Sequence, residues 1–406
     1  MTKAFETMEL LFDRQEALLR STKMDFVRGY MAHINWTAPM LCIRGAKGVG
    51  KTTLLRQFVK QHFEPGCSEV LYCSLDWTYF ATNTLLAVSQ RFHQHGGRLL
   101  ILDEVHKYAN WSREVKEISE IYPDMQIILS GSSALRLIDG DADLSRRCVG
   151  YDMPGLSFRE YLQFYKGITL PQFSFEDLLA NPHPFVAQVN EVCRPLQHFH
   201  EYLKVGYYPY YLTNPIDYYT LIDQSISHAI EVELPQLRHV DPANCRKIKA
   251  LLSVLSQQVP FEVDIAKLAN TIGLQRNTVV EYLNHLKDAK LLALLYSDLI
   301  SVKKMQKPDK IYLDNPNLMH ALATTAVNKG TLRECFAVNQ LSYGHTVEYS
   351  KKAGDFRIDG KWTIEIGGIN KTYDQIADQS DAYILADDIE NAYGHKLPLW
   401  LLGFLY

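Results

Sequence analysis

One segment, Met40–Phe58, constrains this chain more than any other. Its sequence, MLCIRGAKGVGKTTLLRQF, predicts an apolar strand, a glycine-rich turn and an amphipathic helix, in that order. The turn, Gly45–Thr52, matches G-x-x-x-x-G-K-[ST] at every fixed position. Gly45, Gly48 and Gly50 can take backbone angles that a side chain would forbid, so that successive N–H groups point inward around phosphate oxygens. Because the following helix adds a positive dipole end, the segment predicts a site for nucleotide phosphates.

Two side chains of this turn have expected roles in a nucleotide complex. Lys51 would reach the β- and γ-phosphates, and the Thr52 hydroxyl would ligate Mg²⁺. The full set of expected nucleotide contacts in the loop is Gly45, Lys47, Gly48, Val49, Gly50, Lys51, Thr52 and Thr53. The alternative interpretation is a glycine turn that binds nothing.

Composition sets the class of protein. The 406 residues are too many for one small core and predict roughly two to four domains. A net charge of −4 argues against a generally basic nucleic-acid binder, although a local basic patch remains compatible with it. Seven scattered cysteines without a C-x-x-C pair predict free thiols in a reducing cytoplasm. The sequence shows no signal-peptide pattern and no stretch approaching about 18 apolar residues, so we expect no membrane span.

A parallel sheet is predicted around the phosphate loop. Apolar strands are expected over 40–43, 69–76, 98–104 and 126–132, with helices between them and one or two helices before the first strand. Near-continuous apolar strands separated by helices are typical of a parallel sheet covered on both faces. Phosphate sites in such folds lie at the carboxyl ends of the strands, where this chain has its polar residues.

The polar residues at two of these strand ends are the remaining site candidates. Asp103 ends a buried strand and can hold Mg²⁺ through the loop threonine or through a water. Glu104 is placed to polarise a water for attack on the γ-phosphate. Ser130 and Ser132, at the end of the next strand, are candidates to hydrogen-bond the γ-phosphate or that water. The alternatives are a solvated strand end and a small-residue turn.

Five motifs in the first part of the chain together resemble a branch of prokaryotic AAA-type ATPases. Besides Gly45–Thr52 they are LDEVHKY-x-x-W (102–111), ILSGSSA (128–134), Arg147 and GLSFREYL (155–162). The resemblance implies a Mg²⁺-dependent ATPase core, predicted here over residues 1–163, and ATP as the nucleotide, since no guanine-reading N-K-x-D motif stands in the expected place. It also places Arg146 and Arg147 where an arginine could stabilise charge on the γ-phosphate. A surface ion pair is the alternative for Arg147.

Residues 164–245 are rich in tyrosine and proline and predict a helical lid or connector. The stretch Gly206–Pro209 is similar to a glycine-proline stretch that follows the ATPase core in the same family. We expect the tyrosines to pack rather than to bind a ligand.

Residues 246–312 are similar to a winged helix-turn-helix. Helices are predicted over 247–259, 265–271 and 275–289, followed by a strand over 291–296. In a DNA-binding version, residues 275–278 (Gln, Arg, Asn and Thr) would enter the major groove. Lysines at 303, 304, 307 and 310 would meet phosphates. Because the reading helix also carries Glu281 and Asp288, a plain packing module is the alternative.

Residues 313–406 resemble restriction-endonuclease-like domains. A helix with Glu334, strands with Asp355 and Glu365, and a further helix from about Thr372 follow the order of such domains, in which clustered acids bind a divalent metal. The lysine expected two residues past the second acid is replaced by Gly367, and Lys371 is the nearest substitute. The alternatives are an active nuclease and a nuclease-shaped domain with a structural or binding role.

The predicted fold class is α/β: a P-loop parallel-sheet core, a helical connector, a winged helix-turn-helix and a small α/β domain. The predicted function is Mg²⁺-dependent ATP hydrolysis that switches the arrangement of the C-terminal modules, with DNA as a possible partner and the oligomeric state open. One alternative is a DNA-binding regulator with slow turnover, and another is an ATP-gated, metal-dependent nuclease.

Overall fold

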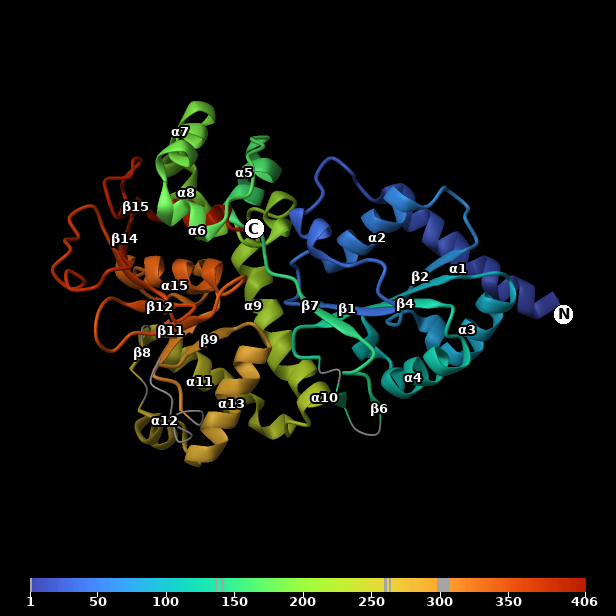
Figure 1. Ribbon diagram of the computed structural model, residues 1–406. Helices are drawn as coiled ribbons and strands as arrows, with labels where there is room; N and C mark the ends of the chain where they lie inside the picture. The colour runs from blue at the N-terminus through green and yellow to red at the C-terminus, as the bar shows by residue number, and fades with distance from the viewer. Residues whose placement is uncertain (1, 136–137, 140–141, 259–260, 263, 298–306) are drawn as a thin grey trace. The chain divides into compact units, whose positions relative to one another are not determined.

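The computed structural model describes residues 2–406 apart from 136–137, 140–141, 259–260, 263 and 298–306. The chain divides into two compact units, Met1–Pro154 and Gly155–Tyr406 (Figure 1). The finer boundaries expected after residues 163, 245 and 312 stay predictions. Among the described residues, no helix combines the length and apolar character needed to cross a bilayer.

The first unit is built on a five-stranded sheet in the order β2-β3-β4-β1-β7. All its pairings are parallel, which confirms the predicted parallel-sheet core. Its strands are β1 (Met40–Gly45), β2 (Val70–Ser74), β3 (Leu99–Asp103), β4 (Gln126–Ser132) and β7 (Val149–Asp152). Ser74 pairs with Asp103 and Gly45 with Ser132, so the carboxyl ends of four neighbouring strands lie together at one edge.

Helices cover both faces of this sheet, with α2 on one face and α4 on the other (Figure 1). The helices of the unit are α1 (Thr2–Ser21), η1 (Gly29–His33), α2 (Lys51–His62), η2 (Thr78–Ala81), α3 (Leu85–Gln94), η3 (Val105–Lys107) and α4 (Trp111–Ile121), and a small hairpin pairs β5 (Ile138–Asp139) with β6 (Ala142–Asp143). All five residues of β2 and all five of β3 are buried. Burial on both faces explains why these strands are continuous apolar runs without alternation.

The second unit begins with a set of helices rich in buried aromatic rings. They are α5 (Phe158–Lys166), α6 (Phe175–Ala180), α7 (His183–Val192), α8 (Pro195–Val205), η4 (Pro209–Leu212), α9 (Tyr218–His228), the π-helical turn η5 (Ala229–Glu233), α10 (Leu234–Arg238) and η6 (Pro242–Asn244). Tyr161, Tyr202 and Tyr218 are each at most 1% exposed, in agreement with the expected packing role. Ser157 and Glu160 form a capping box that fixes the start of α5.

Three helices and a three-stranded antiparallel sheet follow. They are α11 (Cys245–Gln258), β8 (Phe261–Glu262), α12 (Ile265–Ile272), α13 (Arg276–Asp288), β9 (Leu292–Leu295) and β10 (Lys310–Leu313), with the strands in the order β8-β10-β9. Asp264 caps α12, and Gly273, with φ of 68°, ends it in the left-handed conformation before α13 begins. The assignment of this part as a winged helix-turn-helix stays a prediction.

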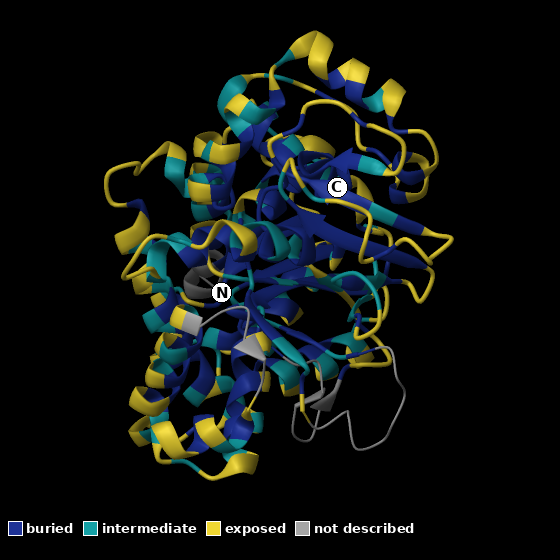
Figure 2. Ribbon diagram, turned by 90° about the vertical axis from the view of Figure 1, so that its left-hand side faces the viewer, coloured by how far each residue is buried: buried dark blue, intermediate teal, exposed yellow. Residues whose placement is uncertain are grey.

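The last part packs α14 (Pro316–Leu322) and α15 (Lys329–Leu341) with a mixed sheet in the order β11-β12-β13-β14-β15. Its strands are β11 (Val347–Tyr349), β12 (Phe356–Ile358), β13 (Trp362–Gly367), β14 (Ala382–Ala386) and β15 (Lys396–Pro398), and η8 (Leu399–Phe404) ends the unit. Figure 2 shows the sheet strands buried and the outer turns of the helices exposed.

The helix expected from about Thr372 is wrong, because residues 372–379 form turns between β13 and β14. Ile376 is buried in this segment with Ile384 and Ile389 of the following chain, whereas Tyr373 is exposed. A single buried anchor in eight residues gives no apolar stripe that would hold a helix against the sheet.

Candidate nucleotide site

The loop after β1 has the backbone that a phosphate cradle requires. Gly48 and Gly50 have φ of 89° and 102°, in the region where side chains are strained. Gly45 has a different reason to be glycine, since its φ is not positive and a Cβ there would lie 2.6 Å from the Met153 carbonyl oxygen. Gly50 leads into α2 with no side chain capping the first turn. The first N–H groups of α2 are therefore placed to receive an anion.

The side chain of Lys51 folds back onto the start of this loop. Its Nζ donates to the carbonyl oxygens of Gly45, at 2.8 Å, and Ala46, at 3.1 Å, and the residue is 6% exposed. Binding a phosphate would exchange these two neutral acceptors for charged ones, which form stronger hydrogen bonds with an ammonium group. Of the other expected contacts, Lys47 and Thr53 are exposed, whereas the Val49 side chain is buried.

The structure brings Thr52 and Asp103 together although they lie 51 residues apart. Thr52 Oγ1 donates to Asp103 Oδ2 at 2.7 Å, and Asp103 is 1% exposed. A hydroxyl that gives its proton to a carboxylate directs its lone pairs elsewhere, as a metal ligand must. A hydroxyl and a carboxylate at one buried point are the oxygen donors that Mg²⁺ prefers, so these residues fit that ion.

Three more groups donate to the Asp103 carboxylate. The Tyr72 hydroxyl donates to Oδ2 at 2.7 Å, the Glu104 backbone N–H donates to Oδ1 at 3.1 Å, and the Ser130 hydroxyl forms a short hydrogen bond with Oδ1. The Ser130 hydroxyl therefore donates its proton to Asp103. Its contact with a nucleotide stays a prediction. Tyr72 was not anticipated from sequence, and the only signal was a phenol within an apolar strand.

Glu104 follows Asp103 directly and has a left-handed backbone, with φ of 55° and ψ of 42°. Such a conformation is unusual for glutamate and is found at functional positions, where the surrounding structure offsets its cost. The side chain is 32% exposed, and its Oε2 lies 3.4 Å from Nε2 of the buried His106. A partly exposed carboxylate beside an imidazole suits a residue that orients water. His106 was also missed from sequence, although it lies two residues after Glu104.

Arg147 forms an ion pair on the surface of the first unit. Its Nη2 lies 2.9 Å from Glu120 Oε1, and its side chain is 43% exposed. This geometry matches the alternative given above, and the role of Arg147 toward a nucleotide stays a prediction. The neighbouring Arg146 is exposed.

Arg28 is a further buried residue that contacts the loop and that the sequence did not indicate. It donates from Nη1 to the Val49 carbonyl at 3.0 Å and to the Pro154 carbonyl at 3.2 Å. Since Arg28 is 5% exposed, these carbonyls are held by a buried guanidinium. The loop backbone is thereby tied to the last residue of the first unit.

In the second unit, the acids expected from the endonuclease resemblance converge. Burial raises the pKa of Glu334 and of Glu365, and the charge of the Asp355 carboxylate raises both further. Lys371 forms a short ion pair with Glu365, reaching it from the turns after β13. Glu334 accepts a hydrogen bond from the Tyr312 hydroxyl at 2.6 Å. The three carboxylates are not among the groups of described residues whose oxygens all lie within 4.8 Å of one another, so a shared metal ion stays a prediction.

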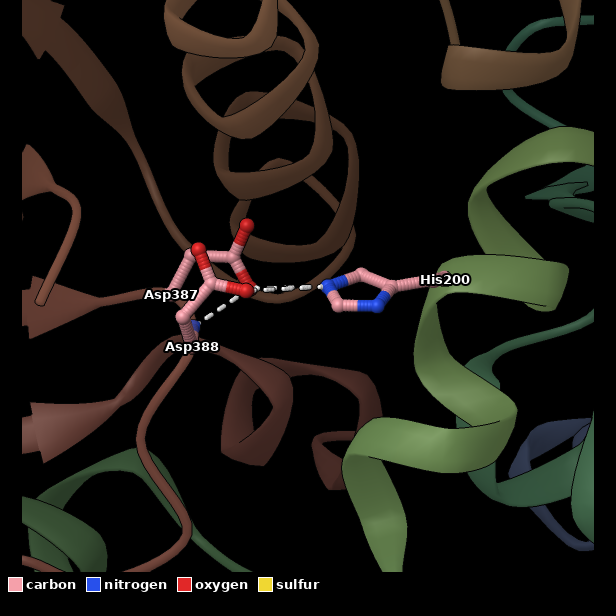
Figure 3. A group of neighbouring side chains, drawn as sticks. All are labelled: His200, Asp387 and Asp388. Carbon is pink, nitrogen blue, oxygen red and sulfur yellow. Dashed lines mark hydrogen bonds and ion pairs between the residues drawn. The ribbon is translucent and has the colours of Figure 1, made fainter.

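A second group of metal-ligand types in this unit comprises His200, Asp387 and Asp388 (Figure 3). His200 Nε2 lies 3.5 Å from Asp387 Oδ1 and 3.4 Å from Asp388 Oδ1. Arg333 pairs with the other oxygens of both carboxylates, at 3.2 and 3.5 Å. This arginine already compensates the acids, so the cluster is explained as an ion-pair network.

The surface expected to meet DNA is only partly available. Residues 275–277 are exposed at the start of α13, but Glu281 is exposed on the same helix. Lys307 is exposed. In contrast, Lys310 Nζ lies 3.7 Å from Glu334 Oε2 and 4.7 Å from the centroid of the Tyr349 ring, so its charge already has partners within the protein. Lys303 and Lys304 lie outside the described residues.

Comparison with known proteins supports this assignment of the first unit. Residues 37–162 match the model of the AAA domain, and residues 196–329 match a domain of unknown function, DUF8612. The uncharacterized protein MJ1637 of Methanocaldococcus jannaschii is 26% identical over 404 residues, covering 90% of this chain and 84% of its own length. The strand order, the loop and the AAA match together support an AAA-type P-loop ATPase core, and with it nucleotide binding and hydrolysis.

Two solved structures resemble the chain only weakly. The Aeropyrum pernix ORC1 protein in complex with DNA gives a TM-score of 0.31 at 12% identity, over 77% of this chain and 91% of its own. C. elegans PCH-2 gives 0.26 at 14% identity, over 66% of each chain. At such TM-scores neither structure bears on function.

Proposed function

We propose that this protein binds ATP with Mg²⁺, hydrolyses it, and uses the cycle to switch the arrangement of its C-terminal modules. The observation that carries the proposal is the 2.7 Å hydrogen bond between Thr52 of the loop and the buried Asp103. This hydrogen bond joins the loop to Asp103, the carboxylate expected to hold Mg²⁺, at the common edge of β1, β3 and β4. The modules are those expected at 164–245, 246–312 and 313–406, after the ATPase core at 1–163.

Each residue then has a distinct task. The loop N–H groups and Lys51 hold the phosphates, and Thr52 with Asp103 would hold the ion. Mg²⁺, when bound, neutralises charge on the β- and γ-phosphates. Glu104 orients the attacking water and accepts its proton, with His106 beside it. Arg147 would stabilise charge on the γ-phosphate once released from Glu120.

Replacing Glu104 with Gln tests this function. The amide keeps the shape of the side chain and removes its basicity, so ATP turnover should fall about 100-fold or more while ATP binding survives. Phosphate release and the affinity for a fluorescent ATP analogue are the two measurements. Glu117→Gln, an exposed change on α4, is the matched control and should leave both unchanged. Unchanged turnover in Glu104→Gln would remove its proposed role.

A metal-dependent nuclease gated by ATP is a second candidate function. The observation that favours it is the ion pair of Lys371 with Glu365, next to Asp355 and Glu334. The pair places a lysine at the acids although the position two residues past Glu365 is glycine. In such a site the acids would hold the ion and the lysine would assist the attacking water.

Cleavage of labelled DNA with Mg²⁺ or Mn²⁺, with and without ATP, measures this activity. If the wild-type protein cleaves, Asp355→Ala should abolish cleavage and leave ATP turnover intact, because the two sites use different residues. Asp381→Ala, an exposed acid before β14, is the control. The absence of cleavage by the wild-type protein, or its persistence in Asp355→Ala, would leave the domain with a structural or binding role.

A further inference from the structure

The Tyr72 hydroxyl is a part of the nucleotide site to which the proposed ATPase cycle gives no task. Tyr72 lies in β2, is fully buried, and donates to Asp103 Oδ2 at 2.7 Å. The same oxygen accepts the Thr52 hydroxyl at 2.7 Å. Tyr72 and Thr52 therefore hold one carboxylate oxygen from two different elements, β2 and α2.

Arg56 determines the direction of this hydrogen bond. Its Nη2 donates to the Tyr72 oxygen at 3.2 Å, and its guanidinium carbon lies 5.2 Å from the centroid of the Tyr72 ring. Because a guanidinium has no acceptor, Tyr72 must accept from Arg56, and its single proton remains for Asp103.

Thr52 and Arg56 are four residues apart on α2 and so lie on the same face of the helix. One helix thus contacts both ends of the Tyr72–Asp103 pair. If the Tyr72 hydroxyl were absent, the Asp103 carboxylate could turn, and Thr52 would lose the fixed acceptor that directs its lone pairs outward.

We propose that Tyr72, oriented by Arg56, is a positioning residue that holds the Asp103 carboxylate in the orientation needed for Thr52 and Asp103 to take Mg²⁺ with the nucleotide. The inference rests on the proposed ATPase function and adds residues that the loop and strand motifs do not contain. It assigns Tyr72 and Arg56 to metal-dependent binding of the nucleotide rather than to the phosphate contacts themselves.

Replacing Tyr72 with Phe removes one oxygen and tests the assignment without measuring turnover. The full-length protein is titrated with N-methylanthraniloyl-ADP in EDTA and again in MgCl₂, and the ratio of the two affinities gives the Mg²⁺ enhancement. We expect Tyr72→Phe to reduce this enhancement about tenfold, as for a lost hydrogen bond to a charged group, with affinity in EDTA unchanged. Thermal melting without nucleotide establishes that the variant is folded.

Tyr79→Phe is the matched control, because Tyr79 is a buried tyrosine of the same unit whose hydroxyl has no hydrogen-bond partner among the described residues. It should keep the wild-type enhancement. Arg56→Met leaves the Tyr72 hydroxyl in place and removes the group that orients it, so a smaller reduction in the same direction is expected. If Tyr72→Phe does not fold, the Mg²⁺ enhancement of Arg56→Met tests the proposal instead, and a wild-type enhancement in that variant would contradict it.

Two outcomes would overturn the inference alone. A wild-type enhancement in folded Tyr72→Phe would do so, and so would an equal loss of affinity with and without Mg²⁺, which is the result expected of a merely structural residue. If the wild-type protein binds no nucleotide under either condition, the proposed ATPase function fails and the inference fails with it.

Discussion

At the scale of single residues, Gly45 shows that one motif position can have two physical causes. The loop pattern accounts for its glycines by backbone angles, and this holds for Gly48 and Gly50. Gly45 instead leaves room for the carbonyl of Met153, and the backbone N–H of Met153 donates to the Arg44 carbonyl at 2.7 Å. The space between the loop and the chain after β7 is therefore as constrained as the loop itself.

Gly45→Ala should destabilise the first unit because its methyl group would have to displace backbone. We expect a loss of about 1–3 kcal/mol in the free energy of unfolding, as for overpacking of a filled interior, and weaker ATP binding. Urea denaturation followed by fluorescence measures the first effect. Gly344→Ala, at a glycine with open space around it, should be close to neutral. A Gly45→Ala protein as stable as the wild type would show that the chain after β7 moves aside freely.

At the scale of elements, the sequence predicts the strands of the parallel sheet, because burial of both sheet faces requires apolar residues along their whole length. Strands β1 to β4 were anticipated because buried parallel strands are continuous apolar runs, and Asp103 because it ends one of them. The roles of Tyr72, His106 and Arg28 are not foreseeable, since each depends on a partner 21 or more residues away in sequence that only the fold brings close. The order of elements in endonuclease-like domains predicts a helix where the chain forms the turns at 372–379, because that order carries no information on the missing apolar stripe.

The first turn of α13 is the element that decides whether DNA is a partner. Residues 275–277 are exposed there, and Arg276 offers a charge. If this turn meets DNA, Arg276→Ala should weaken binding about tenfold and reduce the slope of log affinity against log salt by about one. Lys287→Ala makes the same change of charge at the exposed far end of α13 and is the control. Equal effects of the two variants, measured by fluorescence anisotropy, would indicate net charge rather than a docked helix.

At the scale of the whole molecule, Arg28 connects the phosphate loop to the junction of the two units. It holds the carbonyls of Val49, within the loop, and of Pro154, the residue before the second unit begins. A loop that rearranges around phosphates would move the Val49 carbonyl, and the guanidinium would pass the shift to Pro154. We propose that continuity of the chain then carries the shift to Gly155, which would make this arginine a route from the nucleotide to the second unit.

Arg28→Lys tests that route, since an ammonium keeps the charge but lacks the planar fork that spans two carbonyls. In the wild-type protein, hydrogen exchange of residues 155–166 should differ between the ATP-bound and nucleotide-free states. Arg28→Lys should bind ATP within about threefold of the wild type, because the loop N–H groups and Lys51 remain, yet lose most of that difference. Arg98→Lys, an exposed arginine of the same unit paired with Asp124, should preserve it. A nucleotide-dependent exchange pattern that survives intact in Arg28→Lys would mean that the signal, if the second unit receives one, leaves the first unit by other contacts.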